Sequence, residues 1–303
     1  MMTREYHIPV LLKNSVDGLN IEPSGVYVDM TFGGGGHSRA ILERLGPDGR
    51  LIAFDQDADA WENAPNDDRL ILVKHNFRFL KNFLDFLGYE KVDGILGDLG
   101  VSSHHFDAPE RGFSFRFNGS LDMRMGPGLE KTAADVLNQY PEDRLFYVFK
   151  FYGEVPSPGR LIRKIADFRG SQKFETTTQL KELAETIAPR RDVNKYLAQV
   201  FQALRIEVNS EMEALKEILM QTPDVIKPGG RLVIISYHSL EDRLVKNFIR
   251  SGNVEKSQAE TDLYGHRDVP FKAVTRKAVQ SDATEVEDNP RARSAKLRIA
   301  EKL

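Results

Sequence analysis

Glycines and acids in the first third of the chain have the types and spacing of a nucleoside-binding site. In the stretch DMTFGGGGHS (29–38), four consecutive glycines follow an apolar run. A glycine-rich turn between a strand and a helix lets a ligand lie against backbone N–H groups. Asp55 ends the next apolar run, where nucleotide-binding α/β proteins place an acid on a ribose hydroxyl. The pattern predicts an adenosine-containing ligand, although a tight turn followed by a helix-capping Asp55 would use the same residues.

The glycine run does not match the dinucleotide fingerprint G-x-G-x-x-G, because the sixth position counted from Gly33 or from Gly34 is not a glycine. His37 also stands where a pyrophosphate requires a small residue. S-adenosylmethionine carries an adenosine but no phosphates, so it tolerates both departures. Asp29 suits the ammonium group of that ligand, and a strand-end or capping role suits Asp29 equally well.

A third acid, Asp98, lies in the stretch ILGDLGVSS (95–103) at the end of another apolar run. Ligands of open α/β sheets bind beyond the carboxyl ends of the strands, so we expect Asp98 beside the glycine loop and close to Asp55. The alternative role for Asp98 is an N-cap at the next turn. The glycines on either side of Asp98 favour a close approach of the backbone to a ligand.

The elements that must position these acids alternate between short apolar runs and helical patterns, which predicts a parallel sheet with helices on both faces. Strands are predicted at 26–31, 50–55, 70–75, 92–99 and 230–238, and helices at 38–45, 58–64, 77–88 and 240–250. More than a hundred residues separate the fourth strand from the fifth, which is too many for one crossover. A subdomain must therefore be inserted between them.

The insertion begins near a loop rich in glycine, arginine and aromatic residues and continues through helical patterns. We expect the first part of the main domain at 1–107, a helical substrate-recognition subdomain at 108–198, and the second part of the main domain at 199–303. An amphipathic helical segment at 194–221 leads back to the sheet. Two closing strands are predicted, at 274–279 and 294–303.

The composition is that of an ordinary globular protein, with 41% hydrophobic and 29% charged residues in 303. The net charge of -3 requires no polyanionic partner, so any basic surface must be local. The N-terminus lacks signal-peptide features and no apolar run reaches the length of a membrane span, so we expect a cytoplasmic protein without a membrane partner. The absence of cysteine excludes disulfides, thiolate metal sites and cysteine nucleophiles.

Seven segments, spread in order over nearly the whole chain, carry a family resemblance. They are DMTFGGGGHSRAIL, AFDQDADA, GDLGVSS, RGFSF with LDMRM, FQALRIEVN, PGGRLVIISYHSLEDRLVK and NPRARSAKLRIAE. Together they resemble the ribosomal RNA small-subunit cytosine-N4 methyltransferase family, also called MraW or RsmH. The resemblance implies a Rossmann-like class I S-adenosylmethionine-dependent methyltransferase fold with an inserted helical subdomain.

The same resemblance implies methyl transfer from S-adenosylmethionine to N4 of a cytidine in the decoding region of small-subunit (16S) ribosomal RNA. The partner would be that RNA within the assembled or nearly assembled small subunit. By motif match, the cofactor contacts would fall on Gly35, Gly36, His37, Asp55, Phe77, Asp98 and His105. His105 replaces the family's glutamine, and Asn118 and Gly126 replace its aspartates; imidazole still provides one hydrogen bond.

The chemistry of the acceptor indicates Asp98 as the catalytic residue. Methylation of pyrimidine carbon 5 generally needs a cysteine nucleophile, which this chain lacks, so nitrogen or oxygen methylation remains. The lone pair of a cytosine amine is delocalised into the ring, so the enzyme must orient the amine and accept hydrogen bonds from its N–H groups. Asp98, or the carbonyls of Leu99 and Gly100, would accept them without a strong general base.

A base in folded RNA must be single-stranded or flipped out before an enzyme can modify it. The stretch RGFSFRF (111–117) predicts stacking and phosphate contacts, and GRLIRKIADFRGSQK (159–173) predicts a basic patch. The candidate RNA contacts are Arg111, Phe113, Phe115, Arg116, Arg160, Arg163, Lys164 and His238. Phenylalanines that anchor a loop to the core, and a solvated basic helix face, are the alternative interpretations.

The stretch SYHSLEDR (236–243) has the residue types of a hydrolase but lacks the nucleophile elbow G-x-S-x-G. Ser239 and Asp242 instead predict a capping box at the start of the next helix, with His238 as a wall residue of the site. No histidine spacing predicts a catalytic metal. Two rival functions stay open, a nicotinamide-dependent oxidoreductase and a non-catalytic RNA-binding or ribosome assembly factor.

Overall fold

The structure is a computed structural model that describes residues 9–256 and 269–303. The chain divides into two compact units. The first unit comprises Met1–Gly100 and Met212–Leu303, and the second comprises Val101–Glu211. In the part of the chain that is described, no helix is long and apolar enough to cross a membrane.

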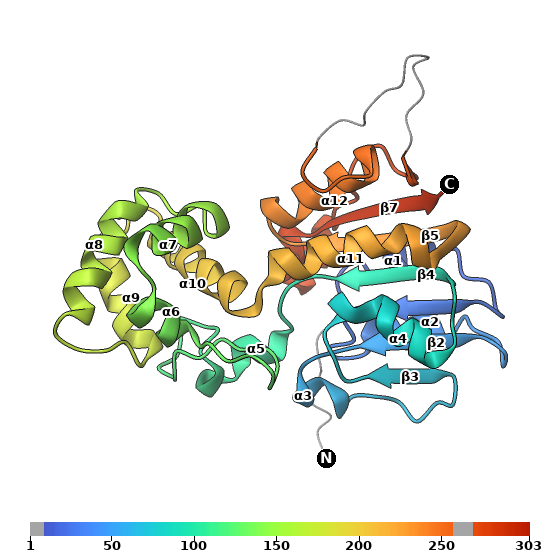
Figure 1. The fold of residues 1–303 in the computed structure, drawn as a ribbon, viewed down its shortest axis with the longest axis horizontal. Helices are drawn as coiled ribbons and strands as arrows, with labels where there is room; N and C mark the ends of the chain where they lie inside the picture. The colour runs from blue at the N-terminus through green and yellow to red at the C-terminus, as the bar shows by residue number, and fades with distance from the viewer. Residues whose placement is uncertain (1–8, 257–268) are drawn as a thin grey trace. The chain divides into compact units, whose positions relative to one another are not determined.

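One sheet forms the centre of the first unit, with strand order β3-β2-β1-β4-β5-β7-β6 (Figure 1). β1 to β5 are parallel, and β7 pairs antiparallel with both β5 and β6. The strands are β1 (Val26–Asp29), β2 (Arg50–Phe54), β3 (Leu70–Val73), β4 (Val92–Asp98), β5 (Ile226–Ser236), β6 (Phe271–Ala273) and β7 (Lys296–Lys302). The Rossmann-like α/β fold predicted from the sequence is confirmed, because the apolar runs that predict the first five strands do form them.

Helices cover both faces of the sheet because successive strand residues point to opposite sides and both sides are apolar. On one face, Val16 and Ile41 from two helices share a core cluster with Leu51 of β2. On the other face, the rings of Phe54 and Phe83 meet with centroids 5.8 Å apart. The helices of this unit are α1 (Leu12–Gly18), α2 (Gly36–Leu42), α3 (Ala58–Trp61), η1 (Phe77–Phe79), α4 (Leu80–Leu87), α11 (Glu211–Val225), α12 (Ser239–Ser251), α13 (Ala283–Asp288) and η4 (Pro290–Ser294).

The strand order reverses between β1 and β4, which is the place where open α/β sheets bind ligands. β1 lies between β2 and β4, with Asp29 in register with Ala53 and Leu96. β5 continues the parallel run beside β4. The segments that follow β1, β2, β4 and β5 therefore leave the sheet at the same edge.

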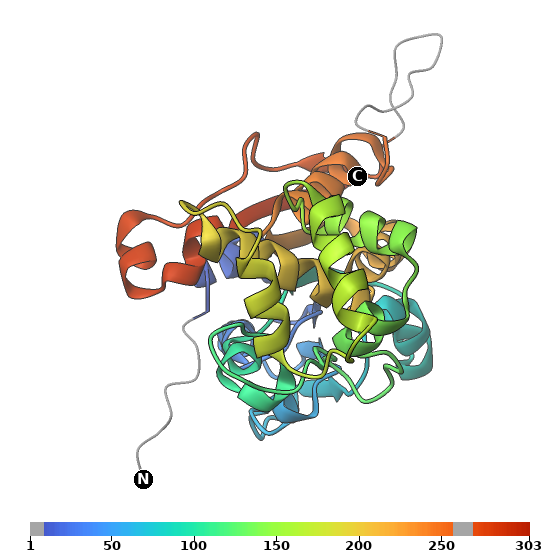
Figure 2. The same ribbon diagram turned by 90° about the vertical axis from the view of Figure 1, so that its left-hand side faces the viewer.

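The second unit is built from helices packed around α10 (Figure 2). Val200, Phe201 and Leu204 form the buried stripe of α10, as the helical spacing of these residues predicts. The unit starts shortly after β4 and contains all of α10, so it extends on both sides of the 108–198 expected for the insertion. Its helices are α5 (Ser103–Asp107), η2 (Pro109–Arg111), α6 (Ala133–Gln139), α7 (Glu142–Tyr147), η3 (Val148–Tyr152), α8 (Pro158–Arg169), α9 (Thr177–Glu185) and α10 (Val193–Asn209).

Two details differ from the sequence expectation. The helical segment predicted at 194–221 is broken at Ser210, whose φ of 50° lies in the left-handed region and ends α10 before α11 begins. The strand predicted at 274–279 lies earlier in the chain, at β6, and only Val279 of the predicted run bridges to Leu297. The apolar spacing predicts an element in both cases; a local backbone conformation sets the first boundary and strand pairing sets the second.

Candidate active site

The four glycines after β1 do not share one role. Gly33 has a φ of 51°, and its backbone N–H donates to Asp55 Oδ2 over 2.8 Å. Gly35 has a φ of 74°, and a Cβ there would lie 2.9 Å from the ring of Phe32. At Gly36 a Cβ would lie 2.1 Å from Pro9 Cγ, so the N-terminal segment, and not a ligand, requires a glycine at that position.

Asp55, directly after β2, ties the glycine loop to the next turn. Its Oδ2 accepts from Gly33 N and its Oδ1 accepts from Asp57 N, each over 2.8 Å. Its carbonyl oxygen accepts from Trp61 Nε1 over 3.0 Å. Each carboxylate oxygen has two lone pairs, so the side chain still has capacity for ribose hydroxyls. The half-buried Asp55 therefore orders the loop and keeps acceptor capacity for a ligand.

Asp29 is fully buried at the end of β1, and its carboxylate accepts hydrogen bonds from residues on both sides of the glycine loop. Its Oδ2 accepts from Ser38 Oγ over 2.6 Å, and its Oδ1 accepts from Thr31 N over 3.0 Å. Because the carboxylate has no exposure, the contact with a ligand ammonium considered for Asp29 has no direct path. The strand-end alternative describes its role, because Asp29 holds the turn after β1 and the hydroxyl of Ser38.

Asp98 ends β4 and is held by residues of the two neighbouring strands, β1 and β5, and of the turns after them. Its backbone N donates to Thr31 Oγ1 over 2.7 Å, after β1, and the next residue, Leu99, donates its N–H to Ile235 O over 3.0 Å, on β5. The hydroxyl of Tyr237, directly after β5, donates to Asp98 Oδ1 over 2.7 Å. Its side chain is 16% exposed, so Asp98 is fixed but not sealed from solvent.

The ring of His37, at the start of α2, lies between the N-terminal segment and Asp98. Its Nε2 lies 3.2 Å from Val10 O, and its Nδ1 lies 3.9 Å from Asp98 Oδ2. A carbonyl oxygen can only accept, so Nε2 carries a proton and donates it to Val10 O. The side chain of His37 is therefore held by Val10 and lies beside Asp98, which leaves the backbone of His37 as the part that a cofactor would contact.

Three acids meet at this edge of the sheet with little positive charge beside them. Burial raises the pKa of both Asp55 and Asp98 to about 6, and it also raises the pKa of Asp29. Hydrogen bonds from backbone and hydroxyl groups oppose the rise without cancelling it. A bound ligand that carries positive charge would favour the ionised carboxylates, so the site is electrostatically suited to a cationic nucleoside.

Phe77 opens η1 directly after β3 and is half-buried. β3 is next to β2, so Phe77 follows the strand beside the one that carries Asp55. His105 belongs to the second unit, where it is 6% exposed, with its Nδ1 lying 2.9 Å from Ser102 Oγ and its ring centroid 4.8 Å from that of Phe113. The first unit thus brings together every predicted cofactor residue except His105.

The predicted RNA contacts of the second unit fall into two groups. Phe113 is 3% exposed and belongs to the core, so it is not a platform for a base, contrary to the expectation for RGFSFRF. Phe115 is half-buried against Phe201, with ring centroids 5.6 Å apart. Arg111 donates to Arg124 O over 3.1 Å, which fixes the loop. The exposed candidates are Arg116 and, on α8, Arg160, Arg163 and Lys164.

Three exposed aromatic side chains on the second unit were not singled out in the sequence. Phe146 is 44% exposed, Tyr147 42% and Phe151 53%. They lie on α7 and on η3, which is a π-helical turn, a rare element that often accompanies function. Their sequence, FYVFKFY, is as apolar as that of a buried helix, so the sequence alone does not show which of its rings are exposed.

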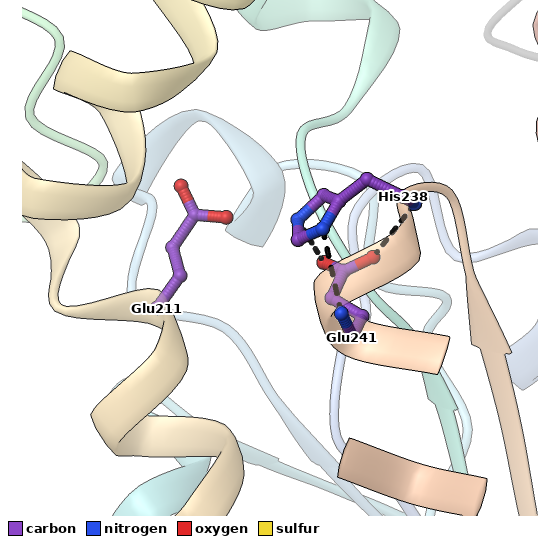
Figure 3. Close-up of side chains that lie close together, drawn as sticks. All are labelled: Glu211, His238 and Glu241. Carbon is purple, nitrogen blue, oxygen red and sulfur yellow. Dashed lines mark hydrogen bonds and ion pairs between the residues drawn. The ribbon is translucent and has the colours of Figure 1, made fainter. Parts of the chain in front are cut away.

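His238 is the N-cap of α12, in place of the predicted Ser239. Its Nδ1 accepts from Glu241 N over 3.4 Å, and Glu241 Oε2 accepts in return from His238 N over 3.3 Å (Figure 3). The capping box therefore starts one residue earlier than predicted, because the histidine ring takes the place of a hydroxyl. Asp242 instead pairs with Arg298 Nε over 2.7 Å, so the predicted cap residues have other roles.

Tyr237 is the main site residue that sequence reasoning missed. It lies within SYHSLEDR, but the hydroxyl contact with Asp98 spans 139 positions of sequence. The only local signal was its position directly after a parallel strand, the same signal that indicated Asp55 and Asp98.

The sequence profile of the MraW methylase family matches residues 4–303. Ribosomal RNA small subunit methyltransferase H of Bacteroides thetaiotaomicron is 57% identical over 297 residues, which cover 98% of this chain and 97% of the relative. The protein of the same name from Christiangramia forsetii is 55% identical over 303 residues, with both chains covered completely. A crystal structure of an rRNA methylase from Streptococcus thermophilus covers 98% of this chain and 99% of its own, with 13% identity and a TM-score of 0.43.

Proposed function

Because the chain belongs to the MraW methylase family, we propose that it transfers the methyl group of S-adenosylmethionine to the exocyclic N4 of a cytidine in 16S ribosomal RNA. The relatives that carry the name ribosomal RNA small subunit methyltransferase H match over 97% or more of their length, which supports the same RNA as substrate. The cytidine amine and its place in the decoding region follow from the sequence resemblance and from the absence of cysteine.

The residues after β1, β2 and β4 fit S-adenosylmethionine. Asp55 can accept hydrogen bonds from the ribose, and the loop from Gly33 to Gly36 offers its backbone N–H groups. The carboxyl groups of Asp29, Asp55 and Asp98 have little positive charge beside them, so a cationic ligand would stabilise their ionised forms. When bound, S-adenosylmethionine supplies an electrophilic methyl group on a sulfonium. Phe77, by its position after β3, would lie against the adenine, and His105 is a further cofactor contact by motif match alone.

The single observation that carries the proposal is the environment of Asp98. Oδ1 is occupied by the hydroxyl of Tyr237, and among the described residues Oδ2 accepts no hydrogen bond. An ionised carboxylate with one open oxygen accepts an N–H from the cytosine amine and holds the nitrogen lone pair toward the methyl group. The proton that the amine loses on methylation passes to Asp98 Oδ2, since a pKa of about 6 suits an acceptor at neutral pH.

Exposed residues of the second unit supply the RNA contacts in this proposal. Arg160, Arg163 and Lys164 would meet phosphates, and Arg116 would add to them. Phe146, Tyr147 and Phe151 offer rings on which unpaired bases can stack. His238 would form part of the wall near the acceptor.

Methyl transfer from labelled S-adenosylmethionine to small ribosomal subunits tests the proposal directly. The subunits come from cells that lack this protein, and the digested nucleosides are identified by mass spectrometry. Label in N4-methylcytidine is the expected result, and assembled subunits should be better acceptors than naked 16S RNA. Cofactor binding without label would require another acceptor.

The same preparation separates the rivals. Tight binding of NADH would favour the oxidoreductase, and RNA binding without any S-adenosylmethionine binding would favour a non-catalytic factor. The failed dinucleotide fingerprint argues against the first, and the ordered loop beside Asp55 and Asp98 argues against the second.

A further inference from the structure

The two oxygens of the Asp98 carboxyl have different surroundings. Oδ1 receives the Tyr237 hydroxyl over 2.7 Å, whereas Oδ2 accepts no hydrogen bond from the described residues and lies 3.9 Å from His37 Nδ1, beyond hydrogen-bond distance. The backbone on both sides of the carboxyl is tied to Thr31 and Ile235. The main chain at Asp98 is therefore fixed, and the Tyr237 hydroxyl is the contact that decides how the side chain is rotated.

Tyr237 is itself held in place by its own turn. Its backbone N donates to Glu241 Oε2 over 2.9 Å, and its ring is half-buried beside the core cluster that covers β5. Phe could fill the same space, so the packing alone does not require a hydroxyl. The hydroxyl donates to Asp98, and this contact requires a tyrosine.

The charges around the pair are mostly negative. Asp29 and Glu241 act on Asp98, and Glu241 and Glu285 act on Tyr237, while His37 is the group that opposes them. Burial together with these acids favours a protonated Asp98 and a protonated Tyr237. A neutral Asp98 would present O–H in place of an acceptor, so Oδ2 could no longer accept an N–H from the amine.

We propose that Tyr237 is a positioning residue for methyl transfer: by donating to Oδ1 it holds Asp98 ionised and leaves Oδ2 directed at the amine of the acceptor base. This inference rests on the proposed function of Asp98. Tyr237 itself touches neither cofactor nor base in this assignment. Its effect passes entirely through the carboxyl that it orients.

The test compares Tyr237→Phe with Tyr27→Phe. Tyr27 is a matched control because it is a buried tyrosine of the same unit whose hydroxyl accepts from Glu22 N over 2.8 Å, away from the acids of the site. The carboxyl carbon of Asp98, labelled with 13C and assigned by its loss in Asp98→Asn, is titrated in each protein. Tyr237→Phe should raise the titration midpoint of Asp98 by about one pH unit, whereas Tyr27→Phe should leave it unchanged.

Methyl transfer to small subunits is then measured against pH in the same proteins. In Tyr237→Phe the acidic limb of kcat should move up by the same amount as the midpoint, and kcat should remain several-fold low at pH 8.5 because the carboxyl is free to rotate. The KM for the subunit should not change. A melting curve of each variant confirms that the fold is retained.

Two results would overturn the inference. One is an Asp98 midpoint that stays the same in Tyr237→Phe, and the other is a shifted midpoint with an unshifted kcat profile. A different pattern identifies failure of the proposed function instead: the unmodified protein shows the expected titration but places no methyl group on small-subunit RNA.

Discussion

At the scale of single residues, the site contains three carboxyl groups whose pKa values are raised by burial, so the folded protein binds their protons more tightly than the unfolded chain does. Asp98 has a pKa of about 6 because burial outweighs the contributions of His37 and Tyr237. A carboxyl whose pKa is raised in the folded state binds its proton more tightly than in the unfolded chain, so it lowers stability above that pKa and has no effect below about pH 4. The loss of stability builds up as the pH rises from about 4 to about 6, and it stays at its full value at higher pH.

Asp98→Asn should therefore stabilise the ligand-free protein while it abolishes methyl transfer. The gain in the free energy of unfolding should be on the order of 2 kcal/mol at pH 7 to 8, and it should vanish near pH 4. Urea denaturation at a series of pH values measures it. Equal stability of the two proteins at every pH would show that the Asp98 carboxyl titrates normally.

Asp55→Asn should weaken cofactor binding by at least tenfold. An amide has one acceptor oxygen where the carboxylate has two, so it cannot hold both Gly33 N and Asp57 N and still receive a ribose hydroxyl. Calorimetric titration with S-adenosylmethionine measures the change. Asp68→Asn, an exposed acid in the same unit, serves as the control and should bind normally.

At the scale of elements, the segment of residues 9–11 acts as part of the site although it precedes the sheet. Pro9 packs on Gly36, Val10 O receives His37 Nε2, and Leu11 N donates to Glu285 Oε1 of α13 over 2.5 Å. The start of α2 is thus fixed by residues from both ends of the described chain. This explains a glycine that sequence reasoning assigned to ligand access.

Gly36→Ala should displace this segment and lower both stability and turnover. Overpacking of this kind typically costs about 1–3 kcal/mol, and the loss of the His37 contact would loosen the neighbour of Asp98. Thermal unfolding and the methyl-transfer rate report the two effects. Gly159→Ala, where the new methyl group meets nothing within 4 Å, should be neutral or slightly stabilising.

The loop around LDMRM depends on one amide of α10. Asn209 is 3% exposed; its Oδ1 accepts from Met125 N and its Nδ2 donates to Met123 O and Arg205 O, each over 2.8 Å. These contacts hold a loop in which Met123 has a φ of 65°. Asn209 is thus one of the anchors of the loop, and neither Asn118 nor Gly126 takes part in these bonds.

Asn209→Ala should cost about 2–4 kcal/mol, because it strands buried backbone groups of the loop. Hydrogen exchange at the Met125 amide should become faster as the loop opens. Asn194→Ala on the exposed side of the same helix is the matched control. If the Met125 amide stayed equally protected, the loop would have to be held by its other contacts, such as Asp122 with Arg124.

At the scale of the whole molecule, the chain divides its tasks between two units. The acids and the glycine loop all lie in the first unit, while most of the candidate RNA contacts lie in the second. A change confined to α8 should therefore affect RNA binding and leave cofactor binding unchanged. The local basic patch expected on a protein of net charge -3 is on that helix.

Replacing Arg160, Arg163 and Lys164 by alanine should weaken binding to small-subunit RNA about tenfold or more and lower the salt dependence by roughly two released ions. Affinity for S-adenosylmethionine should not change. Filter binding over a range of salt concentrations measures the first effect, and calorimetry the second. The control replaces three exposed lysines of the first unit, Lys13, Lys91 and Lys272. Equal losses in the two triple variants would mean that α8 is an ordinary solvated face.

Family membership and the α/β sheet were predictable from the sequence because both depend on local information. Runs such as RLIAF bury both faces of a parallel strand, so their composition alone indicates a central strand. The positions of Asp55 and Asp98 directly after such runs then indicate the edge at which they meet. Placing Asp55 and Asp98 at the same edge requires only that the strands before them are parallel.

The sequence by itself thus determined the five parallel strands, the family and the acids at the carboxyl edge of the sheet. Tertiary structure alone decided that Pro9 occupies the space at Gly36, that His238 caps α12, that Phe113 is buried, and that Tyr237 reaches Asp98. The physical reason is the range of the interactions. Periodicity reports which face of an element is buried, whereas a hydrogen bond or a steric contact between segments far apart in the chain depends on how the elements pack.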